Sequence, residues 1–160
     1  MNGREALKLS INMAKFVCMG YLGDLTEEEL MKRPCEGCNH IKWQLGHLIS
    51  SEHSMISGIA PGSMPELPAG FAEKYTKETA KSDNPADFHS KEQLLSTFES
   101  VRAATLAALD KITDADLDKP TGVHYAETVG AMYELQGSHW LMHSGQWAVV
   151  RRQCGRAPLF

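Results

Sequence analysis

The chain has few or none of the features that mark several large classes of protein. Its 160 residues include only four cysteines, Cys18, Cys35, Cys38 and Cys154, which are too few for a fold built on disulfides. No hydrophobic run approaches the length needed to span a bilayer. The first residues carry charges within their apolar pattern, which argues against a secretory signal. We therefore expect a cytoplasmic protein in a reducing environment, with no membrane partner.

Clustered positive charge is also absent. The sixteen lysines and arginines are spread along the chain, and the formal net charge is -4. Because contact with nucleic-acid phosphates requires a basic patch, the sequence gives no indication of a nucleic-acid partner. Glycine-rich phosphate-binding motifs and serine-nucleophile motifs are missing as well.

Patterns typical of strands are missing, and four segments carry a helical period instead. Apolar residues recur at steps of three and four around residues 7–21, 41–59, 94–112 and 132–150. The length fits one domain, and the 42% of hydrophobic residues is ordinary for a globular protein. We therefore predict an all-α fold in which residues 1–160 form a single four-helix bundle.

Two similar turns divide the predicted bundle into halves. LTEEELMKRP, residues 25–34, aligns with ITDADLDKP, residues 112–120, and each ends in a proline before the next helix. Between the halves lie residues 60–89, which are rich in proline, glycine and polar residues. Phe71 and Tyr75 are candidate anchors for this segment. The sequence thus predicts two helix-pair halves joined by a long crossover loop that lies across the bundle between helices two and three.

Two histidines occupy core positions of the last helical segment. In HWLMHSGQW, residues 139–147, His139 and His143 fall on one face and share an otherwise apolar stripe with Gln136 and Gln146. Buried polar groups cost roughly 1–3 kcal/mol when unpaired, so both imidazoles need partners. A divalent metal ion would satisfy both, because an i, i+4 pair is the usual way for one helix to offer two nitrogen ligands. Separate hydrogen bonds to neighbouring helices are the alternative.

A third ligand would have to come from another helix, and residues 41–59 offer several candidates. Glu52 lies in the middle of the apolar stripe of this segment, where a carboxylate needs a cation or hydrogen-bond donors. His47 lies at the edge of the stripe, so helical geometry alone favours Glu52. His40 stands where the helix begins, and capping explains it as well as ligation does. His53 projects to a different side.

Cys35 and Cys38 form a C-x-x-C just before His40. Two cysteines at this spacing and a histidine can hold zinc, but a closed site needs four ligands and no second C-x-x-C exists. A thioredoxin-like redox function would need a βαβ context, which the pattern lacks. We therefore predict two free thiols, with a reversible disulfide as the alternative.

The second and fourth segments resemble a known family. WQLGHLISSEH and HWLMHSGQWAVVRR are similar to the DinB-like superfamily of metal-binding four-helix bundles, which includes thiol-dependent transferases, and H-x-x-x-H-x-G-Q is the most specific part. The resemblance implies that His47, His139 and His143 are the metal ligands, in place of Glu52 as third ligand. Glu52 or Gln146 would then assist catalysis by orienting a ligand or moving a proton. The C-x-x-C is not part of the family pattern.

Two functions are compatible with this interpretation. Three neutral imidazoles leave a divalent ion with at least one open position, as in catalytic sites. The first hypothesis is therefore a metal-dependent enzyme of the transferase or hydrolase type, with zinc or nickel, that activates a low-molecular-weight thiol or water. The second is a non-catalytic metal-binding or stress-associated interaction module. In that module Glu52 would close the site, and Trp43 and Leu141 would form a homodimer face.

Overall fold

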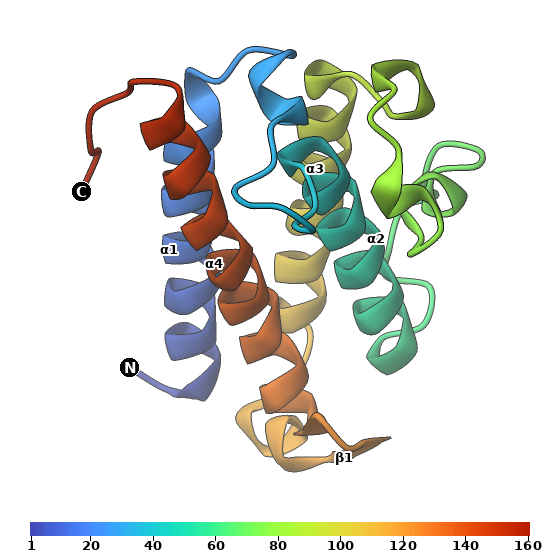
Figure 1. The fold of residues 1–160 in the computed structure, drawn as a ribbon. Coiled ribbons are helices and arrows are strands. Elements are labelled where there is room, and N and C mark those ends of the chain that lie inside the picture. Colours follow the sequence, from blue (N-terminus) through green and yellow to red (C-terminus); the bar gives the residue numbers. More distant parts are fainter.

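Four long helices form the body of the protein in the computed structural model, which describes residues 1–160 (Figure 1). The chain ascends along the first helix, descends along the second, and returns through a long connection. It then descends again along the third helix and ascends along the fourth. The all-α bundle of two helix-pair halves predicted from the sequence is confirmed. The helices are α1 (Gly3–Gly23), α2 (Ile41–Ile59), α3 (Lys91–Asp110) and α4 (Val129–Gln153).

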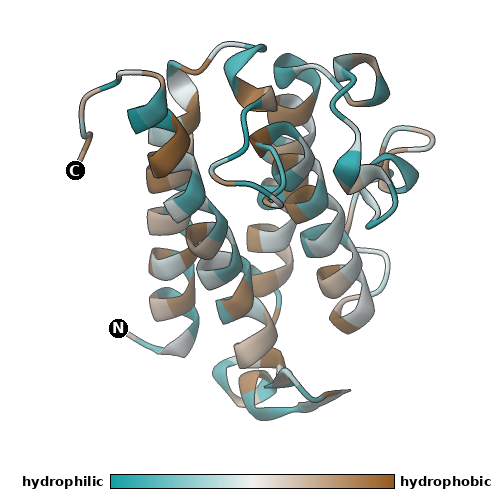
Figure 2. Cartoon of the chain, in the orientation of Figure 1, coloured by the Kyte–Doolittle hydropathy of each residue, from teal (hydrophilic) through white to brown (hydrophobic).

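Hydrophobic residues are concentrated in the helices, whereas most connections are hydrophilic (Figure 2). The side chains that the helical period places on one stripe of α1, such as Ile11, Ala14 and Cys18, are fully buried against the other helices. No helix combines the length and the apolar character that a membrane crossing requires. The core is thus formed by the inward faces of all four helices.

Each helix begins at a side chain that caps its first backbone N–H groups. Asn2 and Ser90 form capping boxes at α1 and α3, and Thr128 caps α4. At α2 the cap is His40, whose Nδ1 accepts a hydrogen bond from the Trp43 N–H at 3.0 Å and whose Nε2 donates to the Ser82 carbonyl at 3.2 Å. Both ring nitrogens are therefore engaged, and His40 caps the helix instead of binding a metal.

The two related turns both fold as short 3₁₀ segments, Glu29–Met31 and Asp114–Asp118. The second turn leads into a small antiparallel hairpin of β1 (Pro120–Val123) and β2 (Ala126–Thr128) at the lower end of the bundle (Figure 1). The sequence predicted no strand here. Strands of four and three residues are too short to show a period of two, which explains the omission.

The crossover loop lies against α2, as predicted. Phe71 and Tyr75 are 1% and 4% exposed and anchor it in the core. A Cβ atom on Gly46 of α2 would lie 2.2 Å from the Tyr75 ring, so the glycine lets the loop approach this helix closely. Trp43 lies under the same loop, 5% exposed, and its indole N–H donates to the Thr76 carbonyl at 3.0 Å. The predicted use of Trp43 in a homodimer face is therefore wrong.

Cys35 and Cys38 are joined by a disulfide in the connection before α2. The prediction of two free thiols is therefore wrong, and the disulfide given as the alternative is present. Gly37 adopts a φ of 75° and the Cys38 N–H donates to the Cys35 carbonyl, which folds the turn. The two Cα atoms consequently lie 5.3 Å apart, within the range that a disulfide spans.

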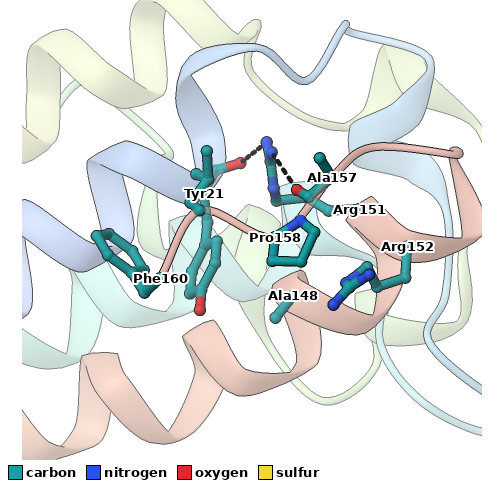
Figure 3. Close-up of a pocket in the computed structure, with 8 residues that line it drawn as sticks. Tyr21, Ala148, Arg151, Arg152, Ala157, Pro158 and Phe160 are labelled. Atoms are coloured by element: carbon teal, nitrogen blue, oxygen red, sulfur yellow. Dashed lines mark hydrogen bonds between the residues drawn. The ribbon is translucent and has the colours of Figure 1, made fainter.

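The C-terminal residues fold back over the ends of α1 and α4 (Figure 3). The Arg151 guanidinium donates to the carbonyls of Tyr21 and Ala157 and pairs with Asp24. The Phe160 ring lies with its centroid 5.6 Å from that of Tyr21. Together these side chains border a small surface pocket at this end of the bundle.

All four helices meet at one buried ion pair. Glu52 of α2 and Arg102 of α3 lie 2.8 Å apart, with side chains 0% and 1% exposed. The Glu52 carboxylate also accepts from Thr105 Oγ1 at 2.7 Å and from Trp140 Nε1 of α4 at 2.9 Å. The Arg102 guanidinium donates to the Ile11 carbonyl of α1. Burial raises the pKa of the Glu52 carboxyl, whereas the cation and these donors stabilise its charged form.

Replacing Arg102 by methionine tests this pair. The variant Arg102→Met leaves a buried carboxylate without its cation, so we expect the free energy of unfolding to fall by about 3–5 kcal/mol. Urea unfolding followed by circular dichroism measures the loss. The control Lys15→Met breaks the half-exposed pair with Glu99 and should cost less than about 1 kcal/mol. Equal losses in the two variants would show that the buried pair does not hold the bundle together.

Candidate metal centre

Three histidines from two helices converge on one point. His47 comes from α2, and His139 and His143 lie one turn apart on α4. Each is half-buried, and one ring nitrogen of each lies within 4.8 Å of the others. Ring centroids are 5.7 Å apart for His47 and His139, 5.8 Å for His47 and His143, and 5.0 Å for His139 and His143. The structure thus brings together the residues that the family resemblance indicated.

The orientation of His143 is set by Gln44 of α2. His143 Nδ1 lies 3.0 Å from Gln44 Oε1, and the same oxygen lies 2.9 Å from Trp147 Nε1. Because an indole N–H can only donate, the atom that it contacts must be the amide oxygen. His143 Nδ1 must then carry the proton and donate to that oxygen. The second nitrogen, Nε2, therefore keeps its lone pair free for an ion.

The Gln44 amide is itself held at its other end. Its Nε2 donates to the Asn39 carbonyl at 2.6 Å and to Gln146 Oε1 at 2.9 Å. With two donors and two accepted bonds in use, the buried amide has every hydrogen-bonding position filled and cannot flip without losing them. Gln44 is therefore a rigid support for His143.

His47 is positioned by an aromatic contact instead of a hydrogen bond. Its ring stacks on Trp43 with centroids 4.9 Å apart and an interplanar angle of 6°. Trp43 is in turn fixed by the crossover loop through Thr76 and Thr79. The loop thus supports the centre from outside the two helices that carry the histidines.

The environment of the three imidazoles favours their neutral form. Burial lowers the pKa of His47, and burial together with the neighbouring His47 lowers that of His139. Burial, followed by repulsion from the other two histidines, lowers the pKa of His143 to about 4. Neutral imidazole is the form that binds a metal ion, so the environment prepares the ligands before an ion arrives.

Glu52 and Gln146, the predicted assisting residues, lie elsewhere. The carboxylate oxygens of Glu52 accept hydrogen bonds from Arg102, Thr105 and Trp140, and Glu52 makes no hydrogen bond to the histidines. A role as fourth ligand or proton carrier thus has no support from the geometry, because burial in the core ion pair satisfies the carboxylate. Gln146 touches the centre only indirectly, by accepting from the Gln44 amide.

The remaining histidines stay outside the cluster. His53, which projects to a different side of α2, donates from Nε2 to the Pro65 carbonyl of the crossover loop at 2.8 Å. His89 pairs with the Tyr75 hydroxyl at 2.9 Å, and only His124 is exposed. Of these two histidines in the connections, His89 is thus half-buried.

Gln44 is the functional residue that sequence reasoning did not identify. The helical wheel places it beside His47 on α2, but its partner lies on α4, and spacing within one helix does not reveal a contact between two. A glutamine between the apolar residues Trp43 and Leu45, next to His47 on the wheel, was the available signal.

The donor set fits a transition-metal ion. Nitrogens bound at about 2.0–2.1 Å to one tetrahedral ion lie roughly 3.4 Å apart, so small side-chain rotations would close the observed spacing. Three imidazoles without carboxylates or thiolates favour ions such as zinc and nickel over calcium or magnesium. The three histidines could therefore hold a metal ion.

Comparisons with known proteins concern the family and the fold of the chain. Residues 18–147 match a family model described as the DinB superfamily. A crystal structure of a conserved protein from Enterococcus faecalis has a similar fold, with a TM-score of 0.71 and 18% sequence identity over 98% of this chain and 99% of that one. None of the curated proteins matches the chain significantly. The structural likeness, at this identity, concerns the fold alone.

The lowered pKa of His143 predicts a pH dependence for the metal-free protein. An ordinary histidine has a pKa near 6.5, so the unfolded chain binds the proton more readily than the folded one between about pH 6.5 and 4. The free energy of unfolding should therefore fall as the pH is lowered through this window. Measured by urea unfolding, the decrease in the free energy of unfolding over this pH window should be smaller in His143→Gln than in the wild type. In His124→Gln the decrease should equal that of the wild type. An unchanged profile in His143→Gln would contradict the buried, neutral state.

Replacing Gln44 tests its hold on His143. The variant Gln44→Met keeps the volume but removes the acceptor, so affinity for zinc should fall about 10–100-fold, the range typical of residues that orient a ligand. Gln136→Met is a matched control, since Gln136 is equally buried at 1% and bonds to the Met132 carbonyl within its own helix. Competition with a chromophoric chelator measures both. Equal affinity in the two variants would remove Gln44 from the centre.

Proposed function

The chain belongs to the DinB superfamily, and we propose that it is a metal-dependent enzyme whose ion is held by His47, His139 and His143. The observation that carries the proposal is the convergence of three neutral, half-buried imidazoles whose nitrogens lie within 4.8 Å of one another. Burying three polar rings side by side without donors would be costly, and a shared cation relieves this cost. The two helices also offer no other acceptor or donor to His139.

The composition of the cluster supports a catalytic ion over a structural one. Structural zinc sites are closed by four protein ligands, whereas catalytic sites use three and leave a position open. No cysteine or carboxylate joins the three histidines. Glu52, the candidate for closing the site, is engaged with Arg102. The three rings are also only half-buried, and a catalytic ion has to be reached by its substrate.

The proposed reaction class follows from the ligand charge. An ion bound only by neutral imidazoles keeps its charge of +2 and supplies Lewis-acid activation of a thiol or of water. We therefore infer a thiol S-transferase or hydrolase acting on a small molecule, with a low-molecular-weight thiol as the candidate cosubstrate. Zinc or nickel is the candidate ion. The chain's own side chains contribute orientation: Gln44 presents His143, and Trp43 presents His47.

The competing function, a non-catalytic metal-binding interaction module, has less support. It requires a fourth protein ligand, and the structure gives Glu52 other partners. It also relied on an exposed Trp43, which is covered by the crossover loop. Its homodimer face would have to be built from other residues.

Metal content tests the first part of the proposal. Purified protein equilibrated with zinc should hold one ion per chain by inductively coupled plasma mass spectrometry. Removing a ligand in His143→Ala should lower the affinity more than about 100-fold, beyond the range for residues that only orient a ligand. His124→Ala replaces an exposed histidine outside the cluster and should bind like the natural protein. Wild-type protein without zinc, or equal retention in both variants, would refute the metal centre.

A second measurement separates a catalytic from a structural ion. Cobalt(II)-loaded protein should change its visible absorption spectrum when 2-mercaptoethanol or azide is added, because an open position accepts an outside ligand. A thiol-conjugation assay with a bimane electrophile, run with and without the ion, then measures transfer. A spectrum that ignores both added ligands would identify a closed, structural site.

A further inference from the structure

The disulfide between Cys35 and Cys38 is not used by the proposed function, yet it lies close to the support of the metal centre. Cys35 is exposed and Cys38 is half-buried, so a small molecule in solvent can reach the first sulfur. The turn that carries them ends directly before Asn39 and the cap of α2. Its position therefore links an accessible disulfide to the helix that carries His47.

A continuous chain of hydrogen bonds connects this turn to a proposed ligand. The carbonyl of Asn39, the residue after Cys38, accepts from Gln44 Nε2 at 2.6 Å. Gln44 Oε1 in turn accepts from His143 Nδ1 at 3.0 Å. Only one side chain, that of Gln44, thus stands between the backbone next to the disulfide and the imidazole.

The turn is also braced by a cation. The Arg33 guanidinium donates to the Cys38 carbonyl at 2.7 Å and pairs with Asp83 of the crossover loop at 2.8 Å. Arg33 also donates to the Ala80 and Ser82 carbonyls, so it ties the turn to the crossover loop.

The disulfide contributes little to holding the fold together. It closes a loop of only four residues, and the stabilisation expected from a disulfide decreases as the loop becomes shorter. The bundle is held instead by its core and by the Glu52–Arg102 pair. Opening the disulfide should therefore change the local turn and leave the four helices folded.

We propose that Cys35–Cys38 is an exchange site for small thiols and that its redox state sets the metal affinity of the histidine centre. This inference rests on the proposed function, because it needs His143 as a ligand. If the protein is cytoplasmic, as the sequence predicts, small thiols surround it, and disulfides that persist there are usually transient or redox-sensing.

The exchange proceeds in two balanced steps. A thiolate attacks Cys35 Sγ, a mixed disulfide forms, and Cys38 leaves as a thiolate that takes up a proton. A second thiolate then attacks the sulfur of the attached small molecule, which releases Cys35 as a thiolate that is likewise protonated. The protein gains two electrons and two protons, and two thiol molecules become one small disulfide.

Reduction acts on the centre through the Asn39 carbonyl. When the disulfide opens, the turn before α2 loses its covalent constraint, and the Asn39 carbonyl that accepts from Gln44 is held by the hydrogen bonds of the neighbouring residues alone. The Gln44 amide then holds His143 less firmly in the tautomer that leaves Nε2 free. Because Gln44 stays in place, we expect metal affinity to fall about three- to tenfold, less than the 10–100-fold typical of removing such a support.

The exchange itself is measured on the metal-free protein. After incubation with graded ratios of reduced and oxidised 2-mercaptoethanol, iodoacetamide trapping and mass spectrometry should locate new thiols at Cys35 and Cys38. The variant Cys38→Ser, treated with oxidised 2-mercaptoethanol, should carry the mixed disulfide on Cys35. A disulfide that stays closed in a large excess of 2-mercaptoethanol while the protein is folded would overturn the exchange site.

The coupling is measured by cobalt(II) titration without any reductant, which would itself bind the ion. Oxidised wild type is compared with Cys35→Ser/Cys38→Ser, which mimics the open turn, and with the control Cys154→Ser, which removes a free cysteine outside the turn. We expect three- to tenfold weaker binding in the double variant alone. In a Gln44→Met background the same double substitution should have no further effect, because the connecting amide is gone.

These titrations distinguish a failure of the coupling from a failure of the metal centre. Cobalt binding by wild type with equal affinity in the double variant would overturn the coupling and leave the metal centre standing. A further loss in the Gln44→Met background would show that any effect bypasses Gln44, which also overturns the proposed path. No cobalt binding by oxidised wild type would overturn the centre and the coupling together. Circular dichroism of each variant confirms that the helices remain folded.

Discussion

The register of α2 against α4, fixed by buried polar side chains, is the constraint on which the rest of the structure depends. Glu52 accepts from Trp140 near the middle of the two helices, and Gln44 accepts from His143 and Trp147 two turns away. Apolar contacts tolerate sliding, whereas buried hydrogen bonds cost about 1–3 kcal/mol each when they are left unmade. Two such contacts therefore set both the position and the rotation of one helix relative to the other.

This register brings the three histidines together where α2 packs against α4. With α2 and α4 locked, His47 faces the i, i+4 pair of α4, and the polar residues behind them decide which nitrogen carries a proton. The crossover loop adds a third support through Trp43, which stacks on His47. The site is thus positioned by rigid helices and by a loop that is itself anchored in the core, which is how precise ligand geometry is maintained. The turn that carries the disulfide is connected to the same hydrogen-bond network, because the Asn39 carbonyl that follows it accepts from Gln44.

Much of the fold could be predicted from the sequence, because helical periods and capping residues act locally. The four helices, the paired turns and the anchoring of the crossover loop by Phe71 and Tyr75 all follow from such signals. The site could be predicted only in part. The spacing of His139 and His143 is visible on one helix, but helical geometry favoured Glu52 over His47, because a wheel does not show that Arg102 on another helix already neutralises that carboxylate. Gln44 depends on a contact between two helices, which no pattern within one helix reveals. The C-x-x-C spacing is compatible with free thiols and with the disulfide that the structure contains, so the spacing alone does not distinguish them.

The coordination sphere of the zinc-loaded protein, measured by X-ray absorption spectroscopy, tests the central claim most directly. Three imidazoles and an open position predict three nitrogen scatterers with the multiple-scattering signature of histidine at about 2.0–2.1 Å, and one further light-atom ligand that exchanges for a sulfur when a small thiol is added. A shell closed by four protein ligands, or one with fewer than three imidazoles that does not change with the thiol, would contradict the account.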